Sequence, residues 1–81
     1  MTIEVLLFAQ LRDALGEAHV RVDAGAGTTA GEFAHAFISD RFGDRFDSMP
    51  IRIAVNETVV AEDHILQDGD RLALLTPVSG G

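Results

Sequence analysis

The feature that most restricts the fold is a single amphipathic helix placed between two groups of predicted strands. It begins at the tetrapeptide TAGE, where Thr29 is expected to cap the first helical amides and Glu32 to reach back to the threonine amide, as in a capping box. Glycine commonly stops a helix, so this one should end near Gly43. Its apolar face is formed by Ala30, Phe33, Ala34, Phe37 and Ile38. A helix with one apolar face must bury that face against another layer, and the predicted strands supply it as a sheet.

Two strands are predicted before this helix. Residues 2–9 (TIEVLLFA) are rich in β-branched and aromatic side chains, and residues 18–23 (AHVRVD) alternate between apolar and polar. In the second of these, Val20 and Val22 share the face that should be buried. Between the two strands, residues 10–16 (QLRDALG) are expected to form a short helical turn that a glycine closes.

The strands predicted after the helix are shorter and are separated by turn signals. Residues 51–55 (IRIAV) and 58–60 (TVV) flank the dipeptide Asn-Glu, which suggests a hairpin with a tight turn. The Asp-Gly pair in residues 67–70 (QDGD) predicts another turn, and residues 71–75 (RLALL) form the last predicted strand. Pairing should stop before Pro77, because proline has no amide proton to donate to a sheet.

This order of elements predicts an α+β domain of the β-grasp, ubiquitin-like type. One principal helix would lie across one face of a mixed sheet of four to five strands. In that fold the first and last strands lie side by side and parallel, which is a property of the fold rather than of the sequence pattern. We expect residues 1–76 to form the domain and residues 77–81 to form a flexible tail that ends in Gly-Gly.

The composition excludes several classes of function. The chain has 81 residues, of which 47% are hydrophobic, and it has no cysteine, which excludes a disulfide framework, a thiolate metal site and a cysteine nucleophile. Thirteen acidic residues outnumber six arginines, with no lysine, and the formal charge is −7. Such a charge repels phosphate backbones, so we expect no nucleic-acid partner and expect a protein partner to offer a basic docking surface.

The N-terminal apolar run does not indicate a membrane protein. It is far shorter than the ~20 residues of a membrane span, and it lacks the basic flank of a signal peptide. We therefore expect a cytoplasmic protein with no membrane partner.

The alternation of the first and last strands predicts an exposed apolar patch. A sheet covered by one helix layer has an open face that should be polar. Because Glu4 and Arg71 must face water, the alternate positions of these strands belong to the core, namely Ile3, Val5, Leu7, Leu72 and Leu74. The apolar residues left on the open face are Leu6, Phe8, Ala73 and Leu75. Such a patch indicates a partner surface; the alternatives are a loop that covers it or a register that is wrong by one residue.

No arrangement of side chains predicts catalysis or metal binding. The three histidines, His19, His35 and His64, have spacings that suit no metal site and are expected to be solvated. Asp68 and Asp70 are expected to form the Asp-Gly turn, because the acids there lack the ligand spacing of a calcium loop. No serine or threonine has a His–Asp arrangement for nucleophilic catalysis. We therefore expect the chain not to be an enzyme on its own.

The remaining reactive group is the C-terminal carboxylate of Gly81. At neutral pH a carboxylate is an anion that resists nucleophiles, so it must first be activated, for example as an acyl-adenylate formed with ATP on another protein. Two glycines have no Cβ and would fit a narrow channel, and residues 77–81 span roughly 16 Å when extended. A Gly-Gly terminus permits this chemistry without establishing it.

Three segments carry a resemblance to a known family. IEVLLFAQLRDALG, AVNETVV and LQDGDRLALLTPVSGG resemble the small subunit of molybdopterin synthase, a β-grasp sulfur carrier, over nearly the whole chain. The resemblance implies that a ubiquitin-activating-like adenylyltransferase adenylates the terminal glycine with ATP and that a sulfurtransferase system converts it to a thiocarboxylate. It also implies that the tail enters the large synthase subunit and gives sulfur to cyclic pyranopterin monophosphate in molybdenum cofactor biosynthesis. Complexes of this family are typically heterotetramers.

The resemblance assigns roles to individual residues. Gly81 is implied to be the thiocarboxylate carrier. The residues implied to lie in the partner's channel are Pro77, Val78, Ser79 and Gly80. The residues implied to contact the partner are Phe8, Val59 and Leu75. No bound cofactor or metal is implied, and the one visible departure is Thr76-Pro77 where the family often has Pro-Pro.

Two other functions remain open. A sibling carrier would supply sulfur for thiamine thiazole or cysteine synthesis; thiazole carriers share the DGD and Gly-Gly motifs but are usually shorter. A ubiquitin-like modifier would instead form isopeptide bonds from Gly81 to lysines of many proteins, and a plain interaction module would not depend on Gly81 at all.

Overall fold

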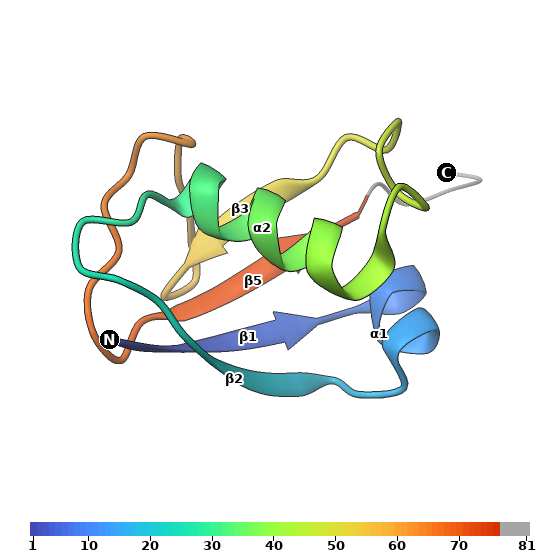
Figure 1. The fold of residues 1–81 in the computed structure, drawn as a ribbon, viewed down its shortest axis with the longest axis horizontal. Coiled ribbons are helices and arrows are strands. Elements are labelled where there is room, and N and C mark those ends of the chain that lie inside the picture. Colours follow the sequence, from blue (N-terminus) through green and yellow to red (C-terminus); the bar gives the residue numbers. More distant parts are fainter. Residues whose placement is uncertain (77–81) are drawn as a thin grey trace.

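A long helix crosses one face of a five-stranded mixed sheet in the computed structural model, which describes residues 1–76 (Figure 1). In chain order the elements are β1 (Thr2–Leu7), α1 (Ala9–Leu15), β2 (His19–Asp23), α2 (Ala30–Phe42), β3 (Arg52–Val55), β4 (Thr58–Val59) and β5 (Arg71–Leu75). The strand order is β2-β1-β5-β3-β4, and β1 and β5 run parallel while the other pairs are antiparallel. The predicted α+β, β-grasp architecture is confirmed. The predicted tail, residues 77–81, lies outside the described residues.

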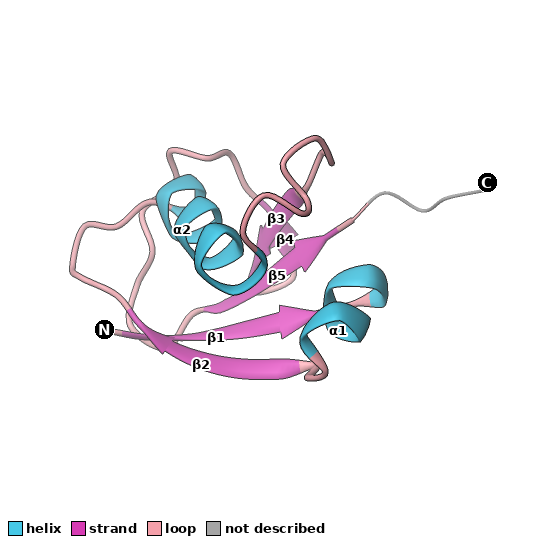
Figure 2. Ribbon diagram, turned by 45° about the vertical axis from the view of Figure 1, so that its right-hand side comes forward, coloured by secondary structure: helices cyan, strands magenta, loops and turns pink. Residues whose placement is uncertain are grey.

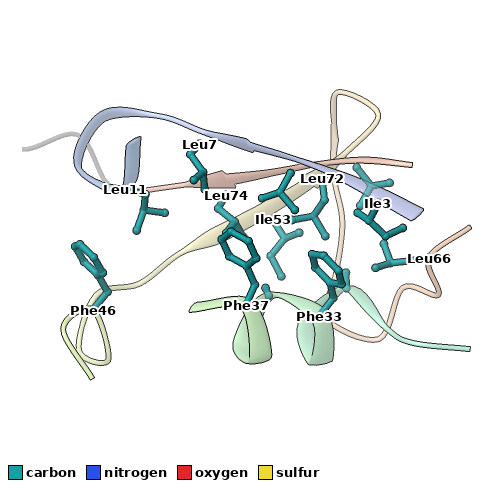
Figure 3. Close-up of a cluster of buried hydrophobic side chains, with 14 residues drawn as sticks. Ile3, Leu7, Leu11, Phe33, Phe37, Phe46, Ile53, Leu66, Leu72 and Leu74 are labelled. Carbon is teal, nitrogen blue, oxygen red and sulfur yellow. The ribbon is translucent and has the colours of Figure 1, made fainter. Parts of the chain in front are cut away.

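The buried side chains of the central strands β1 and β5 form the part of the core that packs against α2. The five side chains that alternation assigned to the core are at most 1% exposed: Ile3, Val5, Leu7, Leu72 and Leu74. Figure 3 shows Phe33 and Phe37 of α2 reaching toward these strands, and their rings stack with centroids 6.3 Å apart. Burial of each such side chain stabilises the fold by about 1.5–3 kcal/mol relative to exposure, so this layer is the main source of stability.

The N-terminus of α2 is closed by the predicted capping box. The Thr29 hydroxyl accepts a hydrogen bond from the Glu32 amide at 3.2 Å, and the Glu32 carboxylate accepts one from the Thr29 amide at 3.0 Å. The amide and hydroxyl of Thr29 both donate to this carboxylate and thereby hold the pKa of Glu32 below its usual value. The helix ends at Phe42 and Gly43 caps it, as predicted.

The first strand is shorter than predicted. It ends at Leu7, and Ala9 has a φ of 47°, which turns the chain into α1. The Phe8 carbonyl accepts hydrogen bonds from the amides of Leu11 (3.1 Å) and Arg12 (3.3 Å). The turn brings Leu11 into the core, where it is fully buried, and this burial is the physical reason that the strand stops two residues early. The short helix predicted before Gly16 is confirmed.

The two aspartates of the predicted Asp-Gly turn also connect that turn to the rest of the domain by hydrogen bonds. Asp68 Oδ1 accepts a hydrogen bond from the Thr2 amide at 2.7 Å. Asp70 is buried, and its carboxylate accepts from the Gln67 amide at 2.8 Å and from Asn56 Nδ2 at 2.9 Å. The turn before β5 is thereby joined to the start of β1 and to the turn between β3 and β4.

The loop that follows β4 packs tightly on the first turn of α2. The Gly31 amide donates to the Glu62 carbonyl at 2.9 Å, and the Ala30 amide donates to the His64 carbonyl at 2.7 Å. A Cβ added at Gly31 would lie 2.7 Å from Glu62 Cβ and 3.1 Å from the Glu62 carbonyl oxygen. The glycine is therefore required by the close approach of two backbone segments.

We predict that Gly31→Ala destabilises the domain by about 1–2 kcal/mol, because overpacking outweighs the higher helix propensity of alanine. Urea denaturation should show the loss as a lower transition midpoint. Gly25→Ala is the matched control, since a Cβ at Gly25 meets only the Thr28 hydroxyl, at 4.0 Å, and that variant should be as stable as the wild type or slightly more so. Equal midpoints for the two variants would contradict the packing argument.

Candidate functional site

Cross-strand register places a row of apolar residues on the face of the sheet opposite α2. Leu6 pairs with Ala73, Ala73 with Ala54, and Ala54 with Val59. Residues that pair directly across a sheet project to the same face, and the alternate residues of these strands are buried against α2. The row therefore crosses four strands on the open face. Figure 2 shows α2 across one side of the sheet and the short helix α1 at the end of β1.

Two further residues extend this row toward the end of β5. Leu75 is half-buried and pairs with Arg52 on the open face. Phe8 follows the Leu7–Leu74 pair, and its backbone stays extended (φ −130°, ψ 160°), so the alternation of β1 continues through it. We call these residues the open-face patch: Leu6, Phe8, Ala54, Val59, Ala73 and Leu75.

The patch presents large apolar side chains to solvent. Phe8 is 46% exposed and Val59 is 56% exposed, and among residues 1–76 the only other large hydrophobic side chain that is exposed is Ile65. No loop among residues 1–76 hides them, and the β1–β5 register confirms the predicted faces of the two strands. An exposed apolar patch of this kind indicates a surface that contacts another protein.

The three contact residues implied by the family resemblance all belong to this patch. Phe8 and Leu75 lie level with each other past the last β1–β5 pair, and Val59 lies on the edge strand β4. Thr76, the last described residue, follows Leu75 directly, so the described part of the chain ends next to the patch. The predicted tail residues lie outside the described part of the chain: Pro77, Val78, Ser79, Gly80 and Gly81.

Sequence reasoning missed two residues of this face, Arg52 and Ala54. Alternation within RIAV would have found them, because Ile53 and Val55 are core residues and their neighbours must point the other way. Their position beside Leu75 and Ala73 depends on the register between β3 and β5, which the local pattern does not contain.

A cluster of charged side chains borders the patch on the same face. Glu4 pairs across the sheet with Arg21 on one side and Arg71 on the other. Its carboxylate lies 3.1 Å from His19 Nε2, 3.2 Å from Arg71 Nε and 3.8 Å from Arg21 Nε. Partial desolvation alone would raise the pKa of Glu4, but the charges and hydrogen bonds of His19 and Arg71 hold that pKa below its usual value.

The other titratable residues form no catalytic or metal-binding arrangement within residues 1–76. His19 is engaged by Glu4 rather than only solvated, whereas His35 and His64 are exposed. No group of three potential metal ligands occurs in this part of the chain, and every buried side-chain nitrogen or oxygen there has a hydrogen-bond partner. Nor does the described chain contain a helix with the length and apolarity needed to cross a membrane. The open-face patch, next to which the described chain ends at Thr76, is therefore the candidate site.

Known proteins resemble this chain in fold and in sequence over nearly their whole length. Residues 5–81 match the model of the ThiS family. The molybdopterin synthase sulfur carrier subunit of Escherichia coli (strain K12) is 40% identical over 80 residues, which cover 98% of this chain and 99% of that protein. The crystal structure of SAMP1 from Haloferax volcanii has a TM-score of 0.85 and 29% identity, with both chains covered in full.

A solved complex contains a second structural relative. It is the protein–protein complex of subunits 1 and 2 of the molybdopterin-converting factor from Helicobacter pylori 26695. The chain of that complex that matches has a TM-score of 0.69 and 26% identity, and both it and the present chain are covered in full. The resemblance to the small subunit of molybdopterin synthase, first drawn from three sequence segments, is confirmed by these matches. The chain thus belongs to the ThiS family of proteins, as a β-grasp member of the molybdopterin synthase sulfur-carrier type.

Proposed function

We propose that this protein is the sulfur carrier subunit of a molybdopterin synthase and supplies sulfur during molybdenum cofactor biosynthesis. The end-to-end match with the E. coli sulfur carrier subunit is the observation that carries the proposal. The Gly80-Gly81 terminus of the sequence and the exposed open-face patch both fit this role. The protein is a non-catalytic subunit, and the catalytic side chains belong to its partners.

The chemistry takes place on the final backbone carbonyl. On a partner adenylyltransferase, the Gly81 carboxylate attacks ATP and displaces pyrophosphate, which leaves an acyl-adenylate. A sulfurtransferase system then replaces AMP with sulfur and leaves a thiocarboxylate at Gly81. In the large synthase subunit this sulfur is transferred to cyclic pyranopterin monophosphate, and water restores the carboxylate. ATP is consumed by the partner, the chain itself is proposed to bind no cofactor, and we place this chemistry in the cytoplasm.

The open-face patch serves as the docking surface that lets the tail reach these active sites. Phe8, Val59 and Leu75 would contact the large subunit, as the H. pylori relative forms a complex with subunit 2. The tail residues Pro77–Gly80 would lie in a channel of the partner, where glycines fit because they have no Cβ. Residues 77–81 reach roughly 16 Å from the domain when extended, which is enough to carry Gly81 into a neighbouring active site.

A second candidate function is covalent modification of other proteins. SAMP1, whose structure matches with a TM-score of 0.85, is a small archaeal modifier protein. A modifier would use the same activated Gly81 but transfer the acyl group to lysine amines. Isopeptide-linked products in the native cell would favour this function, whereas a thiocarboxylate mass (about 16 Da above the carboxylate) on the last peptide favours the sulfur carrier.

We predict that deletion of Gly81 abolishes sulfur transfer and leaves the domain folded. The deletion moves the terminal carboxylate to Gly80, about 3.5 Å short of the position that Gly81 would reach in the partner's active site. A terminal residue contributes little to a core that residues 1–76 complete. Molybdenum-enzyme activity in the native cell should fall to the level of a strain that lacks the protein, and urea denaturation should be unchanged. Gly25→Ala, in a loop remote from the patch, should retain full activity. Undiminished activity without Gly81 would refute the carrier role.

We also predict that Phe8→Asp weakens binding to the large subunit at least about 30-fold, because docking would bury an unpaired carboxylate. The variant should still fold, since Phe8 is nearly half exposed. Ile65→Asp is a matched control: Ile65 is 54% exposed but lies in the loop that pairs with Thr29, away from the patch. Isothermal titration calorimetry should show a weaker dissociation constant for Phe8→Asp alone. A dissociation constant equal to that of the control would place docking elsewhere.

A further inference from the structure

The charge of the open face has the opposite sign to the charge of the whole chain. Three arginines (Arg21, Arg52 and Arg71) and two acids (Glu4 and Asp23) project from this face, which gives it a net charge of +1 with histidine neutral. The chain as a whole carries −7. The remaining residues therefore contain eleven acids and three arginines and carry −8, so the strand positions of the open face do not share the acidity of the chain.

Ion pairs within the face do not neutralise its arginines. A single carboxylate, that of Glu4, is shared by Arg71, Arg21 and His19. Both arginine side chains remain well exposed, at 68% for Arg71 and 74% for Arg21. Arg52 has no carboxylate within 4.0 Å among residues 1–76. A guanidinium is always charged at physiological pH and offers planar, paired donors that suit a carboxylate.

These arginines frame the open-face patch on two sides. The row Arg21–Glu4–Arg71 lies next to the row Leu6–Ala73–Ala54–Val59 on the side nearer the start of β5. Arg52, paired with Leu75, lies on the opposite side of that row, where the tail begins. A partner that covers the apolar row must therefore cover Arg52 and approach Arg71.

We infer that the protein partner that docks on the open-face patch presents acidic side chains to Arg52 and Arg71 around an apolar centre. This inference rests on the proposed docking role of the patch and adds the chemistry of the partner's surface. The sequence alone led us to expect a basic docking surface on the partner, because the net charge was treated as evenly spread over the domain. The present inference is the opposite. At contact distance local charges dominate, because salt screens charges beyond about 8–10 Å.

A charge reversal at Arg52 tests the inference against a control that changes the net charge equally. Arg52→Glu and Arg45→Glu each make the chain more negative by the same amount, but Arg45 lies beyond α2, over the Phe46 ring. Binding to the large subunit of molybdopterin synthase from the same cell should be measured at low and at physiological salt. We expect Arg52→Glu to weaken the dissociation constant about tenfold at low salt, mainly through a slower association rate, and less at high salt. Arg45→Glu should change it by less than about twofold.

A second variant tests the same inference by a gain of affinity. Glu4→Gln removes the acid that Arg21 and Arg71 share, so an acidic partner should bind this variant a few-fold more tightly. Tighter binding by Arg52→Glu, weaker binding by Glu4→Gln, or equal effects at Arg52 and Arg45 would overturn the inference while leaving the sulfur-carrier proposal intact. Failure of the wild-type chain to bind the large subunit would overturn both. Failure of the carrier proposal alone would appear as sulfur transfer that survives deletion of Gly81.

Discussion

The parallel pairing of β1 with β5 is the interaction on which the rest of the structure depends. It joins the two ends of the domain, with Glu4 beside Arg71 and Leu7 beside Leu74. Because this pairing closes a loop of most of the chain, it has an entropic cost. Burial of the apolar side chains of the two strands against α2 offsets that cost. The same pairing aligns Leu6 with Ala73 on the opposite face and releases the chain past Leu75 at the edge of the open-face patch. The core, the open-face patch and the position at which β5 ends are thus consequences of one register.

Features that depend on local sequence could be predicted, and features that depend on register could not. The capping box at Thr29, the apolar face of α2 and the alternation of β1 and β5 are local patterns, and the structure confirms them. The early end of β1 depends on the burial of Leu11 by distant parts of the chain. The inclusion of Ala54 in the apolar row and the proximity of Arg52 to Leu75 depend on which residues of β3 and β5 pair. No pattern within either strand determines that choice.

The net charge of the chain follows from its composition, whereas the charge of one surface depends on how the strands are arranged. The net charge of −7 is a property of the sequence, but the sign of the charge at the patch is set by which residues alternate onto the open face. The negative charge of Glu4 offsets part of the positive charge of the arginines there. Its lowered pKa keeps this carboxylate ionised well below neutral pH. Because the folded pKa lies below the unfolded one, the stabilisation from this carboxylate is present above the unfolded value and is lost as pH falls through the folded value.

A carrier whose activated group lies on its own backbone must avoid being consumed by its own side chains or by those of a second copy. Lysine amines and cysteine thiols are the side chains that attack an acyl-adenylate most readily, and this chain contains neither. Of the three histidines, His19 is engaged by Glu4, and His35 lies on α2, on the other side of the sheet from the patch. In the proposed role the domain contributes recognition, while the chemistry takes place on the backbone carbonyl of Gly81, which no lysine or cysteine of this chain can attack.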